Sequence, residues 1–294
     1  DALRDAERRG FELVDTRSSP YGEIRVVERH GSRRYMIVNG FDQGGIDLRT
    51  RKSAYRFSDG LIGLGRLYAD GPSSVLILGL GPGVVARRLS DEGMRVDVVE
   101  IDAKIHELAR EYFDYEGGAV IDDGRRYLQR TDRTWDLIIV DAFAGGSPPW
   151  QLYTREAFDL YDRHLNPGGA VILNFVGSHL DPEQRAALEA VVSTARSVFG
   201  TVHTYPDPWE PDDYPTRNIF IAATDNRRSP PLRRGNPQEA GRLSEAIARS
   251  RPVEVAEGRI LTDQSAPLEP LVRHTTEILR NRVREFLPLA ILVR

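Results

Sequence analysis

The feature that most constrains the fold is a continuous apolar run, Val-Leu-Ile-Leu at residues 75–78, which leads directly into a glycine-rich segment at 79–83. Strands that are buried on both faces read as unbroken apolar runs, which is typical of parallel sheets. Gly79, Gly81 and Gly83 allow a sharp turn and a close approach between backbone and ligand. A helical pattern follows at 84–89. The spacing departs from the full dinucleotide fingerprint, so a tight turn without a ligand is the alternative interpretation.

Strands and helices continue to alternate after this unit. Apolar or β-branched runs predict six further strands, at 96–101, 119–121, 136–140, 170–176, 201–205 and 219–223. Helical patterns lie between several of them, at 103–113, 125–129, 154–165 and 182–199, and a turn is expected at 166–169. This alternation predicts an α/β fold over residues 71–225, a Rossmann-like, mostly parallel, seven-stranded sheet with helices on both faces.

The two regions that flank this α/β unit have different sequence patterns. Short strand patterns at 24–28, 34–38 and 43–48, joined by glycine-containing turns, predict a small β-rich domain over residues 1–70. Its first 20 residues show no clear period, and its last part, 52–69, fits a helix. Residues 226–294 are expected to form a loop at 226–237 and helices at 238–250 and 271–286, which pack on the core.

Composition excludes several classes of function. The chain has 294 residues and a net charge of −4, which gives no electrostatic bias toward nucleic acid, so no nucleic-acid partner is expected. It contains no cysteine, and its six histidines have no metal-ligand spacing, so no metal site is expected. No apolar run approaches the ~20 residues of a membrane span. We expect a cytoplasmic protein, although a segment upstream of Asp1 could carry a membrane anchor.

Acidic residues follow three of the predicted strands. Glu100 ends one strand 21 positions after Gly79, where a carboxylate can accept hydrogen bonds from both ribose hydroxyls. Asp123, before Gly124, can accept from the adenine amino group or cap the next helix. Asp141 ends the most apolar strand. Burial of a carboxylate there is energetically unfavourable unless the group is paired or has a function. Ligands of open α/β sheets bind at these strand ends, so the set predicts a nucleoside site.

Together these residues resemble the class I fold that binds S-adenosylmethionine and, more narrowly, the polyamine aminopropyltransferase (spermidine synthase) family. The resemblance extends from Pro20 to about Thr224, and residues 152–158, Leu-Tyr-Thr-Arg-Glu-Ala-Phe, carry its most specific motif. Residues 261–263 and 266–267 resemble a C-terminal motif of larger bacterial relatives, some of which are fused to membrane segments.

The resemblance implies an activity and a role for each site residue. The expected reaction moves an aminopropyl group from decarboxylated S-adenosylmethionine to a small di- or polyamine. Asp141 would orient and deprotonate the attacking amine, and we expect a homodimer. The implied nucleoside-binding residues are Gly79, Gly81, Gly83, Glu100, Asp123 and Gly124, and the implied substrate-binding residues are Gln43, Asp59 and Tyr214.

Three departures from the family pattern leave other functions open. Pro82 and Ala144 stand where the family has acids, and the run at 57–59 reads Phe-Ser-Asp instead of Tyr-His-Glu. A hydrogen bond to a charged group contributes about 1.5–3 kcal/mol, so these changes are large enough to alter substrate preference. One alternative is a methyltransferase that uses intact S-adenosylmethionine, whose carboxylate Pro82 would not repel. Another is a nucleoside-binding protein without catalysis.

Two loops are further candidates. The loop at 145–149 is best interpreted as a mobile loop, and it lies where a gate over the site could be. The acidic-aromatic segment at 206–211 could meet a cationic amine, with a plain surface loop as the alternative.

Overall fold

A computed structural model describes residues 9–69, 71–143, 146–210, 214–225, 249 and 251–288. Its N-terminal part is an antiparallel sheet of four strands in the order β1-β2-β3-β4, namely β1 (Phe11–Ser19), β2 (Gly22–Arg29), β3 (Arg33–Val38) and β4 (Phe41–Asp47). The last three are the predicted strands. The sequence gives no sign of β1, because this edge strand buries only Phe11 and its other side chains are at least partly exposed.

The second sheet has seven strands in the order β10-β11-β9-β8-β5-β6-β7. They are β5 (Ser74–Leu78), β6 (Arg95–Glu100), β7 (Val120–Ile121), β8 (Trp135–Val140), β9 (Leu165–Gly177), β10 (Thr201–Pro206) and β11 (Arg217–Thr224). Only β11 runs antiparallel to its neighbours. The prediction of a mostly parallel, seven-stranded α/β fold is confirmed.

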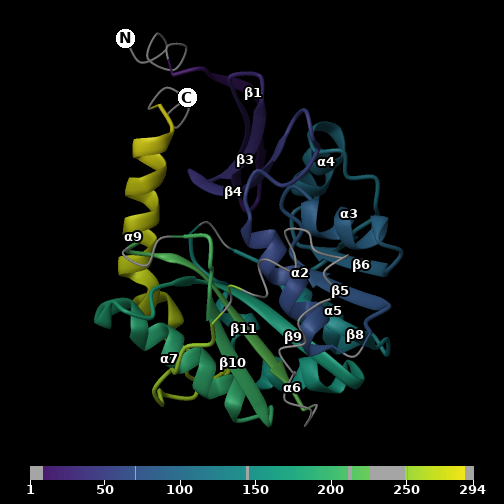
Figure 1. Cartoon of the computed structure of the whole chain (residues 1–294), viewed down its shortest axis with the longest axis vertical. Coiled ribbons are helices and arrows are strands. Elements are labelled where there is room, and N and C mark those ends of the chain that lie inside the picture. The colour runs from purple at the N-terminus through teal and green to yellow at the C-terminus, as the bar shows by residue number, and fades with distance from the viewer. Residues whose placement is uncertain are drawn as a thin grey trace.

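Helices cover both faces of this sheet (Figure 1). They are α2 (Phe57–Tyr68), α3 (Val84–Asp91), α4 (Ala103–Tyr112), α5 (Gly124–Arg130), α6 (Arg155–Arg163), α7 (Pro182–Arg196) and α9 (Leu268–Phe286), with a 3₁₀ turn, η1 (Trp150–Leu152). Leu76 and Leu78 of β5 belong to the core beneath α5, α6 and α7. Val75 and Ile77 belong to the core beneath α2, α3 and α4. This alternation explains why the strand is apolar throughout.

Helix α2 packs on the seven-stranded sheet rather than on the N-terminal one. A Cβ on Gly60 would lie 2.5 Å from the Phe220 ring, and one on Gly65 would lie 2.6 Å from Leu137. These glycines therefore let the helix approach the sheet closely. The predicted boundary near residue 70 remains a prediction, but the contacts of α2 join it to the second sheet.

The predicted turn at 166–169 lies inside β9 as a bulge. Trp135 of β8 pairs with Leu165, whereas Leu137, two residues later, pairs with Ala170. The extra residues of β9 include Gly168, whose φ is +80°. Asn166 Nδ2 donates to Asp136 Oδ1 at 2.7 Å, so the bulge is tied to the neighbouring strand. The turn residues thus bend the strand instead of ending the pairing.

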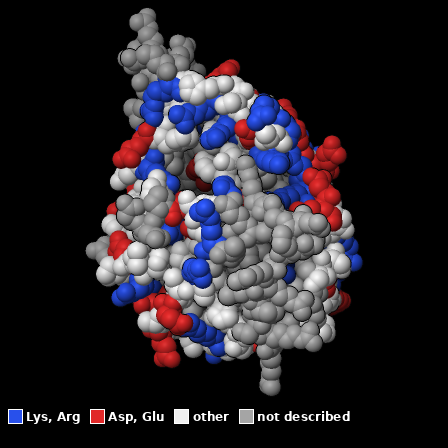
Figure 2. Space-filling model, in the orientation of Figure 1, with Lys and Arg blue, Asp and Glu red and all other residues white. Residues whose placement is uncertain are grey.

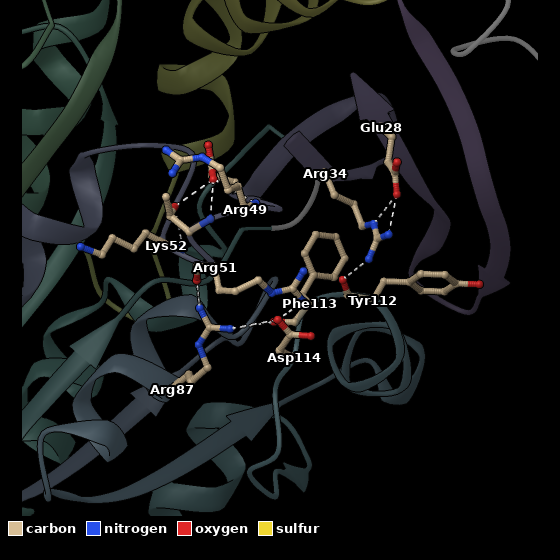
Figure 3. Close-up of polar contacts among 11 residues, drawn as sticks. Glu28, Arg34, Arg49, Arg51, Lys52, Arg87, Tyr112, Phe113 and Asp114 are labelled. Carbon is tan, nitrogen blue, oxygen red and sulfur yellow. Dashed lines mark hydrogen bonds and ion pairs between the residues drawn. The ribbon is translucent and has the colours of Figure 1, made fainter. Parts of the chain in front are cut away.

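Arginines join the N-terminal sheet to the end of α4 (Figure 3). Arg34 of β3 donates to the Tyr112 carbonyl at 2.6 Å, and Arg87 of α3 donates to the Phe113 carbonyl at 3.3 Å. The same Arg87 donates to the carbonyl of Arg51, which itself pairs with Asp114. The last carbonyls of a helix have no partner within the helix, so these contacts satisfy them and fix the two sheets together.

Helix α9 runs along the molecule from α7 to the N-terminal sheet (Figure 1). Val283 and Phe286, with Leu287 just beyond the helix, share a core with Phe11 and Tyr35 of the N-terminal sheet. The helix predicted at 271–286 is thus observed at 268–286. The helix predicted at 238–250 falls almost entirely outside the described residues. Within the described part of the chain, no helix is both long and apolar enough to cross a membrane.

Candidate functional site

A cavity of about 1420 Å³ lies where the two sheets and α9 meet. Its floor is formed by the carboxyl ends of β5, β6, β8 and β9, and β4 and α9 supply its walls. Figure 2 shows a hollow in the upper half of one face of the molecule. Acidic and basic side chains are both spread over this face. The cavity therefore lies at the strand ends where ligands of open α/β sheets bind.

The glycine loop forms one side of this cavity. Gly79, Gly81 and Gly83 have φ values of +96°, +52° and +73°, which other residues rarely adopt. A Cβ on Gly79 would lie 2.3 Å from the Asp141 carbonyl oxygen, so the loop and the end of β8 can touch only at a glycine. Gly79 and Gly81 line the cavity beside Pro82, whereas Gly83 is absent from the lining and lies against Tyr115 at the start of α3, which gives no support to its predicted ligand contact. The loop therefore leaves the backbone open to a ligand, as a nucleoside cradle requires.

Glu100 lies at the end of β6, with only 5% of its surface exposed. Its two carboxylate oxygens accept hydrogen bonds from the backbone N–H groups of Leu80 and Asp102, each at 2.9 Å. Burial raises its pKa, and these backbone hydrogen bonds oppose the rise. Each oxygen keeps a further lone pair for a ligand in the cavity. The residue thus fits two ribose hydroxyls and also fixes the glycine loop.

Asp123 caps helix α5, because its side chain accepts from the Arg126 N–H at 2.9 Å. It lines the cavity with Gly124. Its neighbour Asp122 pairs with Arg126 and is not among the lining residues. The capping interpretation is therefore correct for Asp123, while the adenine contact stays a prediction that its position permits.

Asp141 follows β8 and faces the cavity. Its Oδ1 accepts a hydrogen bond from Asn174 Nδ2 at 2.9 Å. Burial raises the pKa of Asp141, and the Asn174 hydrogen bond partly offsets the rise. The carboxylate forms no ion pair with any described residue. A desolvated carboxylate without a counter-charge favours a cation or a proton, so it can hold an ammonium group and accept its proton.

The predicted substrate residues divide into two groups. Gln43 and Tyr214 both line the cavity, and the Arg282 guanidinium lies 4.1 Å from the centre of the Tyr214 ring. Asp59 is 3% exposed, is absent from the lining and pairs with Arg88 of α3. Its position gives no support to a substrate role. The acid at this position instead ties α2 to α3 through its ion pair with Arg88.

Several polar cavity residues escaped the sequence analysis, and Asn174, Asp42 and Arg282 are among them. Asn174 is 2% exposed, and its Oδ1 has no hydrogen-bond partner within the described residues. A polar residue in the otherwise apolar strand 170–176 was the available signal. Asp42 lies beside Gln43, and Arg282 lies in a charge-rich helix where no local pattern distinguishes it.

Residues 152–158, the most specific sequence motif, support the site but contribute no charged side chain to the cavity lining. Tyr153 is fully buried and its hydroxyl donates to the Asn174 carbonyl at 3.2 Å. Thr154 caps α6 and donates from its hydroxyl to Asp263 at 2.8 Å. Arg125 donates to the same Asp263, at 2.6 Å. The 261–263 motif therefore anchors the C-terminal segment against α5 and α6.

Residues 146–149, in the described part of the candidate gate loop, line the cavity. The Thr276 hydroxyl of α9 donates to the Gly146 carbonyl at 3.4 Å, so α9 contacts this loop. In the other candidate loop, Arg56 lies 3.3 Å from the centre of a Trp209 ring. Among the described residues, no group of three or more histidines and carboxylates is arranged to hold a metal ion.

The fold and the strand-end residues define a methyltransferase-like α/β protein, and comparisons with known proteins specify the family. The spermine/spermidine synthase domain matches residues 56–208, more than half of the chain. A probable polyamine aminopropyl transferase of Bifidobacterium longum is 31% identical over 229 residues, which cover 71% of this chain and 51% of the relative. The chain belongs to the spermine/spermidine synthase family.

Solved structures support the fold. A probable spermidine synthase from Corynebacterium glutamicum aligns with a TM-score of 0.67 at 21% identity, over 85% of this chain and 96% of that one. Human methyltransferase-like protein 13 in complex with SAH aligns with a TM-score of 0.51 at 20% identity, over 68% and 96%. The chain spans about half, or less, of the length of the first curated relatives that it matches.

Proposed function

We propose that the chain is an aminopropyltransferase that uses decarboxylated S-adenosylmethionine and a small di- or polyamine. The observation that carries the proposal is Asp141, a cavity carboxylate without a counter-charge, at the end of the strand that touches Gly79. Family membership and the nucleoside set around Glu100 support it. The cavity is large enough for a nucleoside and an amine together.

The residues present fit the donor. The open glycine loop would receive the nucleoside, Glu100 would hold its ribose and Asp123 would accept from its adenine amino group. When bound, the donor supplies a sulfonium whose C–S bond breaks as the amine nitrogen bonds to the same carbon, and the electron pair leaves on sulfur as methylthioadenosine. The chain itself must supply orientation, exclusion of water and one base.

Asp141 is the proposed base. Primary amines have pKa values near 10.4, so the acceptor arrives protonated at neutral pH and cannot attack. The free oxygen of Asp141 would hold this ammonium group and take one proton from it, which releases the lone pair on nitrogen. Asn174 fixes the other oxygen.

A second candidate, a methyltransferase, is favoured by Pro82. The ring of this residue lies against Gly44, where a Cβ would lie 3.3 Å from it, so the loop has an apolar surface at the position of the family acid. This surface would tolerate the carboxylate of intact S-adenosylmethionine.

Calorimetry with decarboxylated S-adenosylmethionine, the intact cofactor and methylthioadenosine distinguishes the two. We expect the decarboxylated donor to bind more tightly than the intact one, and an amine to be consumed with release of methylthioadenosine. Preference for the intact cofactor, together with no transfer to any amine, would support the methyltransferase instead. The homodimer and the cytoplasmic location remain predictions, and light scattering on the purified chain tests the first.

A further inference from the structure

Most carboxylates that line the cavity already have a partner. Glu100, Asp102 and Asp123 accept from backbone N–H groups, and Glu210 pairs with Arg282 at 3.6 Å. The lining carboxylates of α9, which are Glu269, Glu277 and Glu285, lie on exposed positions of that helix. Two lining carboxylates remain, Asp141 and Asp42. Both are partly accessible from the cavity, and neither forms an ion pair with a described residue.

Asp42 is held in place by neutral donors only. Its Oδ1 accepts from the Gly44 N–H at 2.8 Å, and its Oδ2 accepts from the Tyr55 hydroxyl. Tyr55 is itself fixed by packing against the rings of Tyr35 and Phe57. These contacts orient the carboxylate without an ion pair. The charge of Arg282 acts on Asp42 from α9, but the ion pair of Arg282 is with Glu210. A desolvated charge of this kind is costly unless a counter-ion joins it, and the cavity gives a small cation access to it.

Asp42 lies near the two segments in which this chain lacks the acids of the family. Strand β4 lies against the glycine loop, since a Cβ on Gly44 would lie 3.3 Å from Pro82. It also lies against the loop that follows β8, since a Cβ on Gly146 would lie 2.3 Å from the Phe41 ring. Asp42 is thus on the wall that adjoins both segments in which the family acids are replaced.

The other acids that could fill this role are committed to different contacts. Asp59 pairs with Arg88 and lies outside the cavity. Asp207 is 3% exposed, accepts from the Trp209 N–H at 3.0 Å and is also absent from the lining. Glu210 is opposed by Arg282. Asp42 therefore combines access to the cavity, a fixed orientation and the lack of an ion pair with a described residue, and it has no role in the proposed nucleoside site or at the β8 strand end.

We infer that Asp42 binds the distal ammonium group of a diamine acceptor whose attacking amine meets Asp141. This inference rests on the proposed function and adds a specificity residue to it. Two separate carboxylates in one cavity that form no ion pair with a described residue match a dication, whereas a monoamine would leave one of them unpaired. The preferred acceptor is therefore a linear diamine, and Asp42 with its Tyr55 hydrogen bond replaces the acids absent at positions 82 and 144.

The test compares two acceptors of equal length, 1,4-diaminobutane and butylamine, in the unmodified chain and in Asp42→Asn. The unmodified chain should prefer the diamine in kcat/KM. Asn keeps the shape and removes the charge, so Asp42→Asn should lower kcat/KM for the diamine roughly ten- to a hundredfold, as expected for the loss of a charged hydrogen bond. Its kcat/KM for butylamine should stay within about twofold. Methylthioadenosine affinity should be unchanged, which shows that the site is still folded.

Glu12→Gln is the matched control, because Glu12 is an exposed carboxylate of the same sheet. It should leave both acceptors unaffected. Suppose that the unmodified chain transfers to butylamine. If Asp42→Asn then lowers kcat/KM equally for both acceptors, or for neither, Asp42 does not bind the distal ammonium and this inference alone fails. If the unmodified chain binds methylthioadenosine but transfers to neither amine, the proposed function fails and the inference falls with it.

Discussion

Asn174 Nδ2 donates a hydrogen bond to Asp141 Oδ1 at 2.9 Å across two neighbouring strands. The register of the sheet brings the two together, because Val140 of β8 pairs with Leu173 of β9 and the next residue on each strand faces the cavity. One oxygen of Asp141 is therefore fixed, and the other remains available to a ligand. We therefore expect Asn174 to act on the proposed base by position and by charge stabilisation rather than by chemistry of its own.

This relationship predicts a shift in the pH profile of an Asn174→Leu variant. The hydrogen bond lowers the pKa of Asp141, so its removal should raise that pKa further. The base would then become protonated at higher pH, and the acidic limb of kcat/KM should move up by about one pH unit, given the usual strength of a hydrogen bond to a charged group. A lower rate with an unmoved limb would indicate a packing role only.

Asp141→Asn removes the proposed base while keeping its shape. We expect turnover to fall by ~10²-fold or more, the usual contribution of a positioned base, while methylthioadenosine affinity changes little. The melting temperature should not fall, because the variant no longer desolvates a charge. A steady-state assay beside a melting curve checks both statements. A variant that keeps its activity and melts earlier would assign Asp141 a structural role instead.

Glu100→Gln tests the ribose contact. A glutamine has only one acceptor oxygen, so it cannot satisfy the N–H groups of both Leu80 and Asp102, and the melting temperature should fall as well. Methylthioadenosine should bind more weakly by about 1.5–3 kcal/mol. Free adenine has no ribose, so its affinity is the control and should stay nearly constant in calorimetry. Equal losses for both ligands would count against the assignment of Glu100 to the ribose.

Gly79→Ala tests the contact between the glycine loop and the end of β8. The added Cβ would lie 2.3 Å from the Asp141 carbonyl oxygen, on a backbone with φ of +96°. We expect a loss of about 2–4 kcal/mol in unfolding free energy, from strain and overpacking together. Gly93→Ala is the matched control, since its φ is +87° but nothing lies within 4 Å of the new Cβ. It should lose only about 1 kcal/mol. Equal losses would show that backbone strain alone matters.

Asp42 predicts a pH-dependent stability difference. Burial raises its pKa to about 6, against hydrogen bonds from Tyr55 and Gly44 and the charge of Arg282, which lower it. The folded chain thus holds this proton more tightly than the unfolded chain does. That stabilisation is full below about pH 4 and is lost as pH rises through 6. Asp42→Asn should therefore gain on the order of 2–3 kcal/mol relative to the parent between pH 4 and pH 7. Urea denaturation of both proteins at pH 4 and pH 7 measures this gain. A stability difference between them that is the same at both pH values would contradict the prediction.

The sequence by itself determined the elements of the seven-stranded sheet and three strand-end acids. Apolar runs, glycines and helix caps are local signals, so β5, the glycine loop and the acids Glu100, Asp123 and Asp141 could be located without coordinates. The family motif at 152–158 was also local, although its role is to support Asn174 and to anchor Asp263.

Only the tertiary structure decided which acids serve the cavity. Asp59 and Asp42 are both acids of the region that precedes the glycine loop, and no local pattern separates them. Arg88 of α3 pairs with Asp59 beneath α2, whereas Asp42 lines the cavity, accepts from Tyr55 and forms no ion pair with a described residue. Likewise, the register of β8 against β9 pairs Asp141 with Asn174, and α9 closes the cavity from more than 200 residues further along the chain than β4. Such contacts depend on long-range packing, which a single sequence does not encode as a pattern.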